Sequence, residues 1–366
     1  MVKGKSMVSE EIGLNEALMG AGIEVSETDL GEYIIQLAGE TPSHIIAPAI
    51  HKTRDDVGSL FADKLDIPYE TDPPRLTWIA RKALREKFLA ADLGTSGCNI
   101  ACAETGHITT VSNEGNIRMS TTLPRVHIAI MGMERVAARL EDHDMLLRLL
   151  CRGAAAQNMA TYVSYIGGPR SKSQADGPQE FHLVVLDNGR SRILADPEFR
   201  EMLCCIRCGA CLNHCPVYGA VGGHAYGWVY PGPMGSVLTP LMIGLKTAGD
   251  LPNASSLCGR CEEVCPMSIP LPELLRRQRV RQHQAGLGHK RARWALALWG
   301  AVARRPRLYQ ALTRPAVWLL AKLAGRAGRL RRLPLVGGWT SVRDLPAPEG
   351  HTFQQQWQAR QRRQMP

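Results

Sequence analysis

The stretch "CIRCGACLNHCPVYG", Cys205 to Gly219, places four cysteines within eleven residues and follows the last one with a proline. Its spacing is C-x2-C-x2-C-x3-C-P. A second run, "CGRCEEVCP" at 258–266, has the spacing C-x2-C-x3-C-P. Two-residue gaps allow a tight turn to aim successive thiolates at one iron–sulfur cluster. The two runs therefore predict a ferredoxin-type segment that holds two clusters.

The cysteine that closes each run is predicted to ligate the other run's cluster, as in two-cluster ferredoxins. This crossing gives one cluster Cys205, Cys208, Cys211 and Cys265, and gives the other Cys215, Cys258 and Cys261. The first is predicted to be a [4Fe–4S] cluster. The second has three thiolates, so it is either a [3Fe–4S] cluster or a [4Fe–4S] cluster with a non-cysteine fourth position. Cys204 is a spare thiol whose adjacency to Cys205 makes it an awkward ligand. His214 and His224 are interpreted as outer groups.

Zinc is the competing interpretation of the cysteines. Structural zinc takes four ligands, in two CxxC pairs or in mixtures of cysteine and histidine. Seven cysteines in this order, with both runs closing on Cys-Pro, favour iron–sulfur clusters. The N-terminal "MVKGKSMVSEE" has no apolar segment typical of a secretory signal, which predicts a cytoplasmic protein. In a reducing compartment, clustered cysteines indicate metal or redox chemistry rather than disulfides.

Residues 1–195 alternate between short apolar runs and amphipathic segments. Strands are predicted at 23–29, 32–38, 44–50, 99–105, 107–113, 125–132, 161–167 and 181–189, and helices at 55–65, 73–94 and about 134–151. This alternation is typical of an α/β layer fold. Beyond Asp196 the strand signals stop. A Gly/Pro-rich connection at 216–257 is predicted to become helical after Pro240.

The C-terminal tail is strongly basic. Residues 276–366 contain 20 Lys and Arg against 2 Asp and Glu, whereas residues 1–275 contain 24 against 32. This asymmetry predicts contact with a membrane surface, a nucleic acid or an acidic partner. Alternatively, the tail is a solvated helical face on the chain's own acidic body. No nucleic-acid motif is present, so nucleic acid is not the predicted partner.

The tail is predicted to be helical from Leu271 to about Gly325 and irregular after Pro346. Trp294, Trp299 and Trp318 lie beside arginines, as in a helix at a membrane interface, although helix packing gives the same pattern. No apolar run approaches the ~20 residues of a membrane span.

Outside the two runs the sequence gives few chemical signals. Cys98, Cys102 and Cys151 are interpreted as buried core residues. The polar residues Glu104, Thr105, Asn113, Glu114 and Asn116 are candidates to line a pocket at a strand end. The favoured interpretation of Asn-Glu-Gly-Asn is nevertheless a tight turn between strands. No Walker loop, dinucleotide fingerprint or nucleophile–base pair occurs, so no catalytic residue is assigned.

Several segments, in order over nearly the whole chain, resemble the lactate utilisation protein B family, the iron–sulfur subunits of a bacterial L-lactate oxidation system. They include "ETDLGEYIIQLAGETPSHIIAPAIHK", "AETGHITTVSNEGN", "STTLPRVHIAIMGMERV", "CIRCGACLNHCPVYG" and "SSLCGRCEEVCP". The resemblance implies an α/β lactate-utilisation domain at 1–195, with a fold like CoA transferases and ribose-phosphate isomerases. It implies an α-helical ferredoxin domain at 196–275 and a basic helical tail at 276–366. It implies the same assignment of the seven cysteines.

The resemblance also implies a function. The chain is expected to be the electron-transfer subunit of a complex that oxidises L-lactate to pyruvate with two further lactate-utilisation subunits, one of them rich in cysteines. It would be cytoplasmic, with contact to the inner face of the membrane through the tail. The alternatives are an electron carrier of a heterodisulfide-reductase-like or glycolate-oxidising complex, and a non-redox α/β module braced by its clusters. Family members carry a further stretch before "KGKSM", so an edge element of the sheet is expected to be missing.

Overall fold

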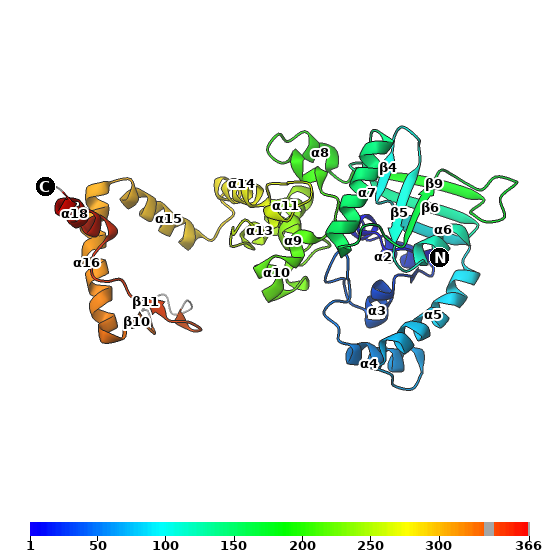
Figure 1. Ribbon diagram of the computed structural model, residues 1–366, viewed down its shortest axis with the longest axis horizontal. Helices are drawn as coiled ribbons and strands as arrows, with labels where there is room; N and C mark the ends of the chain where they lie inside the picture. Colours follow the sequence, from blue (N-terminus) through cyan, green and yellow to red (C-terminus); the bar gives the residue numbers. More distant parts are fainter. Residues whose placement is uncertain (333–339, 365–366) are drawn as a thin grey trace. The chain divides into compact units, whose positions relative to one another are not determined.

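The computed structural model describes residues 1–332 and 340–364, and the chain forms two compact units, Met1–Leu287 and Gly288–Pro366 (Figure 1). The first unit joins an α/β half to a helical half that carries both cysteine runs. Helix α14 (Leu271–Gln284) runs across the predicted boundary at residue 275 and buries Leu274, Leu275 and Gln278 in the first unit. The predicted division into three domains stays a prediction.

A five-stranded parallel sheet forms the centre of the α/β half. Its order is β2-β1-β3-β6-β9, with β1 Val2–Lys3, β2 Ser26–Glu27, β3 Leu93–Gly97, β6 Val126–Gly132 and β9 Glu180–Leu186. All four neighbouring pairs are parallel. Because parallel strands need crossover connections, the helices between them are part of the same layered fold. The predicted α/β class is confirmed, while the closer likeness to CoA transferases stays a prediction.

A second sheet extends the first and has mixed directions. Its order is β7-β4-β5-β8, with β4 Ile100–Cys102, β5 Ile108–Ser112, β7 Val136–Ala137 and β8 Tyr162–Ile166. Helix α7 (Leu140–Ala155) contacts β4. Cys98, Ala101, Ile108, Ala129 and Met131 form an apolar cluster that joins residues of the two sheets.

The remaining helices of this half are short, except for α4 and α5, which pack in one apolar cluster with Val2 of β1. They are α1 Met7–Glu11, α2 Leu14–Gly20, α3 Leu30–Ala38, α4 Arg54–Leu65, α5 Pro73–Ala90, α6 Asn116–Thr122 and α8 Arg190–Leu194. Helix α5 begins where predicted because Asp72 accepts a hydrogen bond from Arg75 N and Pro73 occupies the first helical position. It ends at Ala90, before Gly94, which lies in β3.

Two predicted strands were wrong. Residues 32–38 lie in helix α3, because Leu30, Tyr33, Ile34 and Leu37 recur at helical spacing and pack against α4 and α5. Residues 44–50 form a loop rather than a strand. There His44 Nδ1 accepts hydrogen bonds from the backbone N–H groups of Ile46 and Ala47, which occupies donors that a sheet would need. The strand predicted at 23–29 is reduced to Ser26–Glu27.

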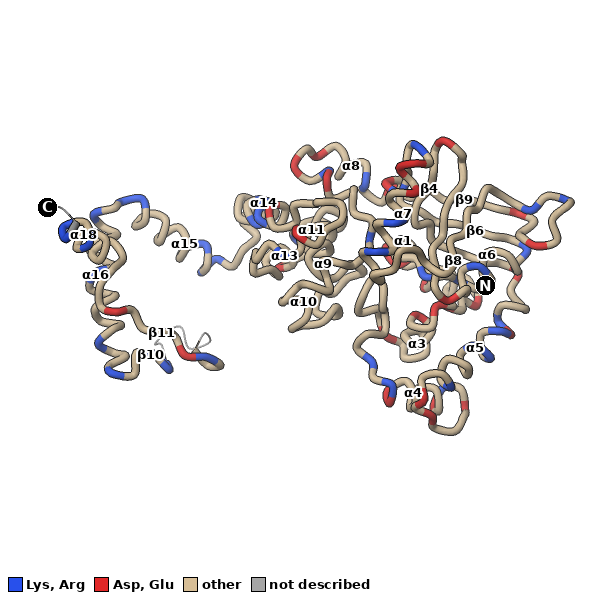
Figure 2. The backbone as a smooth tube through the Cα atoms, viewed as in Figure 1, with Lys and Arg blue, Asp and Glu red and all other residues tan. Residues whose placement is uncertain are grey.

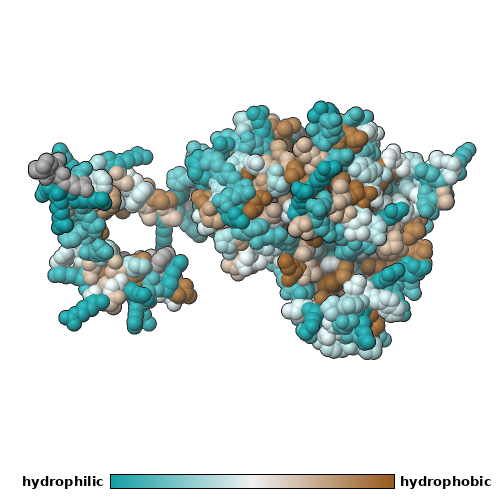
Figure 3. Space-filling model, viewed as in Figure 1, coloured by the Kyte–Doolittle hydropathy of each residue, from teal (hydrophilic) through white to brown (hydrophobic). Residues whose placement is uncertain are grey.

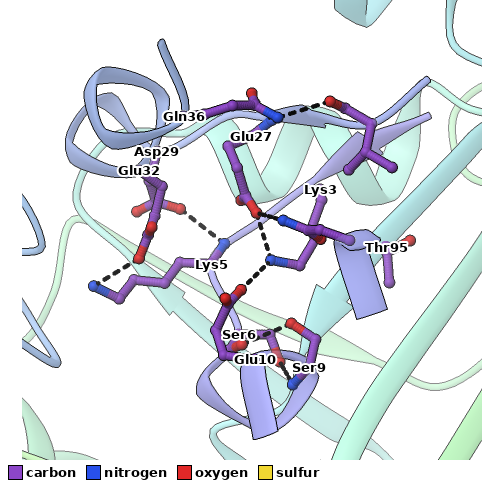
Figure 4. A network of polar contacts seen from close by, with 12 residues as sticks. Lys3, Lys5, Ser6, Ser9, Glu10, Glu27, Asp29, Glu32, Gln36 and Thr95 are labelled. Atoms are coloured by element: carbon purple, nitrogen blue, oxygen red, sulfur yellow. Dashed lines mark hydrogen bonds and ion pairs between the residues drawn. The ribbon is translucent and has the colours of Figure 1, made fainter. Parts of the chain in front are cut away.

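The first strand carries a buried ion network at the base of the α/β half (Figure 4). Lys3 Nζ lies 2.6 Å from Glu27 Oε1 and 2.9 Å from Glu10 Oε1. Burial would lower the pKa of Lys3, but the two carboxylates raise it above its ordinary value. Nearby, Lys5 pairs with Glu32 at 3.2 Å, and burial raises the pKa of Glu32 to about 7. These contacts tie β1 to β2 and α1, and the loop after β1 to α3.

The helical half of the first unit consists of short helices around one apolar core. They are η1 Arg200–Cys204, α9 Ala210–Asn213, α10 Pro216–Val221, η2 His224–Tyr226, α11 Gly232–Ile243, α12 Leu245–Ala248, η3 Leu251–Asn253, α13 Arg260–Glu263 and α14. Phe199, Met202, Tyr230, Leu238 and Leu275 are buried in this core. The helix expected after Pro240 begins eight residues earlier, at Gly232, and Pro240 lies inside it.

The second unit contains α15 Lys290–Ala303, α16 Pro306–Ala324, η4 Gly325–Ala327, the short pair β10 Arg329–Leu330 and β11 Leu345–Pro346, and α18 Phe353–Gln364. The helix predicted to run from 271 to 325 is therefore three helices, α14 to α16. The prediction of irregular structure after Pro346 was also wrong. At the start of α18, Gln355 Oε1 accepts from Thr352 N–H and Thr352 Oγ1 accepts from Gln355 N–H, so the T-x-x-Q pattern was the missed signal.

Among the charged residues of the second unit, Lys and Arg outnumber Asp and Glu (Figure 2), and hydrophobic and hydrophilic side chains are interspersed on its face (Figure 3). Trp294, Trp299 and Trp318 are 78%, 64% and 52% exposed. Among the helices of residues 1–332 and 340–364, none combines the length and the apolar character that crossing a membrane requires.

Candidate functional site

The two cysteine runs fold into loops with the same backbone conformation. Arg207 and Leu257, each just before a cysteine, have positive φ angles of 61° and 57°. Gly209 and Gly259, each just after that cysteine, have φ angles of 77° and 87° and begin the short helices α9 and α13. Non-glycine residues in this conformation occur at sites where the surroundings require it. Such turns gather N–H groups into the concave nests found around iron–sulfur clusters.

Four of the seven cysteines surround one pocket. Cys205, Cys208, Cys211 and Cys265 line it together with apolar side chains that include Ile45, Met234 and Ile269. Burial raises the pKa of Cys208, and its neighbours Cys205 and Cys265 add to the increase. Burial raises the pKa of Cys211 still further. These are the four cysteines that the spacing assigned to the first cluster.

The other three cysteines are also neighbours. Burial raises the pKa of Cys261 to about 11, and Cys215 and Cys258 both contribute. Cys258 is exposed, and hydrogen bonds from the Arg260 backbone and the Ser256 side chain lower its pKa. Cys215 caps helix α10, where its Sγ accepts a bond from Tyr218 N at 3.5 Å. Cys215 thus lies near enough to Cys261 for their charges to interact, as Cys211 also does.

Neither the two nearby histidines nor Cys204 is placed as a further ligand. His214 Nδ1 donates to the Ala210 carbonyl at 3.0 Å, and His224 Nε2 donates to the Thr41 carbonyl at 2.7 Å. Cys204 is exposed and does not line the pocket of the first four cysteines. Cys98, Cys102 and Cys151 are buried, as the sequence predicted for core residues.

Two buried polar groups beside the cysteines lack protein partners among the described residues. Tyr226 is 4% exposed, its hydroxyl makes no hydrogen bond, and burial together with the neighbouring Cys215 raises its pKa. Arg207 Nε and Nη1 are likewise buried without a partner, and Arg207 lies close enough to Cys205 for their charges to interact. Buried donors are normally satisfied, so these groups fit a bound acceptor such as cluster sulfur.

The residues also fit a cluster better than a single ion. In the part of the chain that the structure describes, no three His, Cys, Asp or Glu side chains converge closely enough to hold one metal ion. A cubane instead takes its ligands from separate corners of a larger body. The backbone nests, the unpartnered donors and the grouping of the thiols therefore agree with iron–sulfur ligation.

A buried arginine–glutamate network joins this helical half to the α/β half. Arg190 donates to both oxygens of Glu11, at 2.7 and 2.9 Å, and to Glu134 at 2.5 Å. Arg207 Nη2 lies 3.4 Å from Glu134, and its guanidinium stacks 4.6 Å from the Tyr230 ring centroid. Burial opposes ionisation of Glu134, but Arg207, Arg135 and Arg190 hold its pKa below its ordinary value.

A cavity of about 270 Å³ adjoins the first cysteine loop. Residues that follow β1, β3 and β6 line it, including Lys5, Asn99 and Arg135, and the helical half closes it with Ile206, Arg207 and Tyr230. Ligands of open α/β sheets bind at the carboxyl ends of the strands, where this cavity lies. Ile45, Ile206 and Arg207 line both this cavity and the pocket of the four cysteines.

The polar loop singled out in the sequence contributes only in part. Asn113 and Glu114 line the cavity, whereas Glu104 and Thr105 do not. Asn116 is buried and donates to Asp29 at 2.8 Å, so it holds the loop in place. The predicted turn leads into helix α6 rather than into a strand. Arg135 and Arg207 were missed because arginines in loops carry no local signal of burial.

Three family models match successive parts of the chain: the LUD domain at residues 2–186, the 4Fe-4S dicluster domain at 201–269, and the C-terminal segment of lactate utilisation protein B at 272–362. The dicluster match covers all seven cysteines of the two runs. It supports iron–sulfur clusters as the cofactors of this segment.

Relatives match along almost the whole chain. Lactate utilization protein B of Shouchella clausii is 48% identical over 99% of this chain and 76% of its own, and that of Bacillus pumilus is 46% identical over the same shares. The "uncharacterized electron transport protein YkgF" of Escherichia coli is 44% identical over 96% and 74%. A solved DUF162 family protein from Deinococcus radiodurans aligns with 50% of this chain and 98% of its own, at 16% identity and a TM-score of 0.22, too low to support any inference. The chain belongs to the lactate utilisation protein B family.

Proposed function

We propose that this protein is an iron–sulfur electron-transfer subunit in lactate utilisation. The observation that carries the proposal is the crossed grouping of the cysteines. Cys265 lines one pocket with Cys205, Cys208 and Cys211, and Cys215 and Cys258 lie near enough to Cys261 for their charges to interact, which supports the crossed assignment. This is the arrangement of two-cluster electron carriers. The names of the relatives add lactate utilisation and electron transport.

The first cluster would be held by Cys205, Cys208, Cys211 and Cys265, and the second by Cys215, Cys258 and Cys261. Such clusters pass single electrons at potentials set by charge, hydrogen bonds and burial. The chain's own part is to bury the thiols of Cys208, Cys211 and Cys261 and to place Arg207 and Tyr226 beside them. Arg207 supplies positive charge on the side of the first cluster.

In this proposal the subunit works in a complex that oxidises L-lactate to pyruvate with two further lactate-utilisation subunits. The reaction releases two electrons, and two one-electron clusters can receive them in succession. The exposure of Cys258, against the burial of Cys208 and Cys211, offers the second cluster as the point where electrons pass to or from a partner.

The proposal is tested by iron analysis and EPR spectroscopy of the anaerobically purified protein, before and after reduction with dithionite. We expect about eight irons per chain if both clusters are [4Fe–4S], and about seven if the second is [3Fe–4S]. A [3Fe–4S] cluster shows its EPR signal in the oxidised protein, whereas cubanes show theirs after reduction.

Stoichiometric zinc in place of iron would contradict the proposal. Clusters that form but accept no electrons from dithionite would favour the non-redox alternative, in which they only brace the fold. Partial reduction by L-lactate in a cell extract, with none by glycolate, would separate lactate oxidation from the glycolate-oxidising alternative.

For the second unit we propose peripheral contact with an anionic membrane surface. Residues 288–366 contain 16 Lys and Arg against 2 Asp and Glu. Helices α15 and α16 expose Trp294, Trp299 and Trp318 together with leucines such as Leu298 and Leu323. Basic helices with exposed tryptophan and leucine bind at the boundary between lipid headgroups and acyl chains.

The contact is tested by sedimentation with vesicles that contain anionic lipid and with neutral vesicles. We expect binding to the anionic vesicles only, weakened by salt, and a loss of about tenfold or more in W294A/W299A/W318A because three apolar rings no longer insert. W78A is the control, since Trp78 is 54% exposed but lies in the first unit. Equal binding of the triple variant and the control would contradict the proposal.

A further inference from the structure

We propose that the cavity beside the first cysteine loop binds a small carboxylate anion, with Arg135 holding the carboxylate. The cavity is lined by Lys5, Arg135 and Arg207 and by Asp29 and Glu114. Its volume of about 270 Å³ lies just below the roughly 300–1,000 Å³ usual for small-molecule pockets. It has room for an organic acid and is small for a dinucleotide.

In the buried ion network beside the cavity, arginines outnumber glutamates. Three buried or nearly buried arginines, Arg135, Arg190 and Arg207, share two carboxylates, Glu11 and Glu134. The Tyr230 hydroxyl donates a hydrogen bond to Glu11 and adds no charge. The thiolates of the first cluster site add negative charge beside Arg207, so a further anion would be held by Arg135, which has the weakest ion pair of the three.

Arg135 is the member of this set with the weakest internal partner. Its side chain is 10% exposed, and its one ion pair joins Nε to Glu134 Oε1 at 3.8 Å. No side-chain hydrogen bond of Arg135 is formed within residues 1–332 and 340–364. By contrast, Arg190 makes three hydrogen bonds to carboxylates. Arg135 is thus a cavity-lining residue whose guanidinium donors make no hydrogen bond within the described residues.

Charge and shape favour a carboxylate over a phosphate. A guanidinium fork matches the two oxygens of a carboxylate or a phosphate. Asp29 and Glu114 line the same cavity, and they repel a dianion more strongly than a monoanion.

The position of the cavity gives the bound anion a role. Arg207 lies between Cys205 and Cys208 and lines the cavity as well as the pocket of the four cysteines. An acid held by Arg135 therefore lies one residue layer from the first cluster site. That the acid is the substrate or product of the complex, a 2-hydroxy or 2-oxo acid, rests on the proposed function; that the cavity takes a carboxylate does not.

The test is isothermal titration calorimetry of the anaerobically purified protein with L-lactate, pyruvate, inorganic phosphate and neutral lactamide. We expect the two acids to bind, lactamide not to bind, and R135Q to weaken acid binding at least about tenfold because one charged pair is lost. R118Q is the matched control, since Arg118 is exposed on α6 and does not line the cavity.

R135Q must keep the iron content and the visible spectrum of the unchanged protein. If it does not fold, A155W replaces it, because Ala155 is exposed at the end of α7 and lines the cavity, so a large ring there obstructs the site without disturbing the ion network. The inference is overturned if neither acid binds to the unchanged protein, or if phosphate binds more tightly than the acids. It is also overturned if R135Q, or A155W in its place, binds the acids as tightly as the unchanged protein does.

The outcomes separate this inference from the proposed function. Clusters that form and reduce in a protein that binds neither acid leave the electron-transfer proposal standing and remove the carboxylate site. Acid binding that depends on Arg135, in a protein whose clusters cannot be reduced, removes the electron-transfer proposal and leaves the carboxylate site standing.

Discussion

Replacing Cys265 by serine removes the first cluster and leaves the second, although Cys265 is adjacent in sequence to the ligands of the second. We expect C265S to lose roughly half of its iron, because the first cluster site keeps three thiolates and a weakly ligating hydroxyl. C215S is expected to remove the second cluster instead. EPR spectra of the reduced variants, compared with those of the unchanged protein, show which signal each variant has lost.

C98S is the matched control for both variants. Cys98 is buried like Cys208 and Cys211 but lies in the apolar cluster between the two sheets. The iron content of C98S should therefore equal that of the unchanged protein. C204S decides the role of the spare thiol and is expected to retain both clusters, because Cys204 is exposed. The crossed assignment fails if C265S and C261S lose the same signal while C215S and C211S share the other.

The second large effect is expected from the buried ion network. R190M should lower the free energy of unfolding by about 3–5 kcal/mol, because it leaves two buried carboxylates without their principal cation. Arg190 and the side chains of Glu11 and Glu134 are at most 3% exposed, so solvent cannot replace the lost contacts. Urea unfolding of the variant and of the unchanged protein, both with their clusters, measures the difference.

R125M is the control for this experiment. Arg125 also pairs with a glutamate, Glu180, but both side chains are about half exposed. Exposed pairs contribute about 0–1 kcal/mol, so R125M should differ little from the unchanged protein. Adding E11Q to R190M should restore part of the stability, since it removes one unpaired charge. Similar small losses in R125M and R190M would show that the network is not a major source of stability.

Local signals in the sequence were sufficient for the clusters and for the well-capped helices. The cysteine spacing specifies a turn over a few residues, and the four thiols that it assigns to the first cluster line one pocket, while the assignment of all seven stays a prediction. Helix α5 was predictable because Asp72 and Pro73 define its start within one turn. The prediction of a strand at 32–38 was wrong because a short apolar run fits both the helical and the strand periodicity. Packing against α4 and α5 made the segment a helix.

The sequence by itself determined the chemistry of the cysteine runs, the α/β class and the basic character of the C-terminal unit, because each depends on neighbouring residues or on composition. Only the tertiary structure decided that Arg135, after β6, and Arg207, within the first cysteine run, line one cavity. It likewise placed Arg190 on Glu11, 179 residues away. Such contacts depend on how distant segments pack together, and this packing is set by burial over the whole unit rather than by any local pattern.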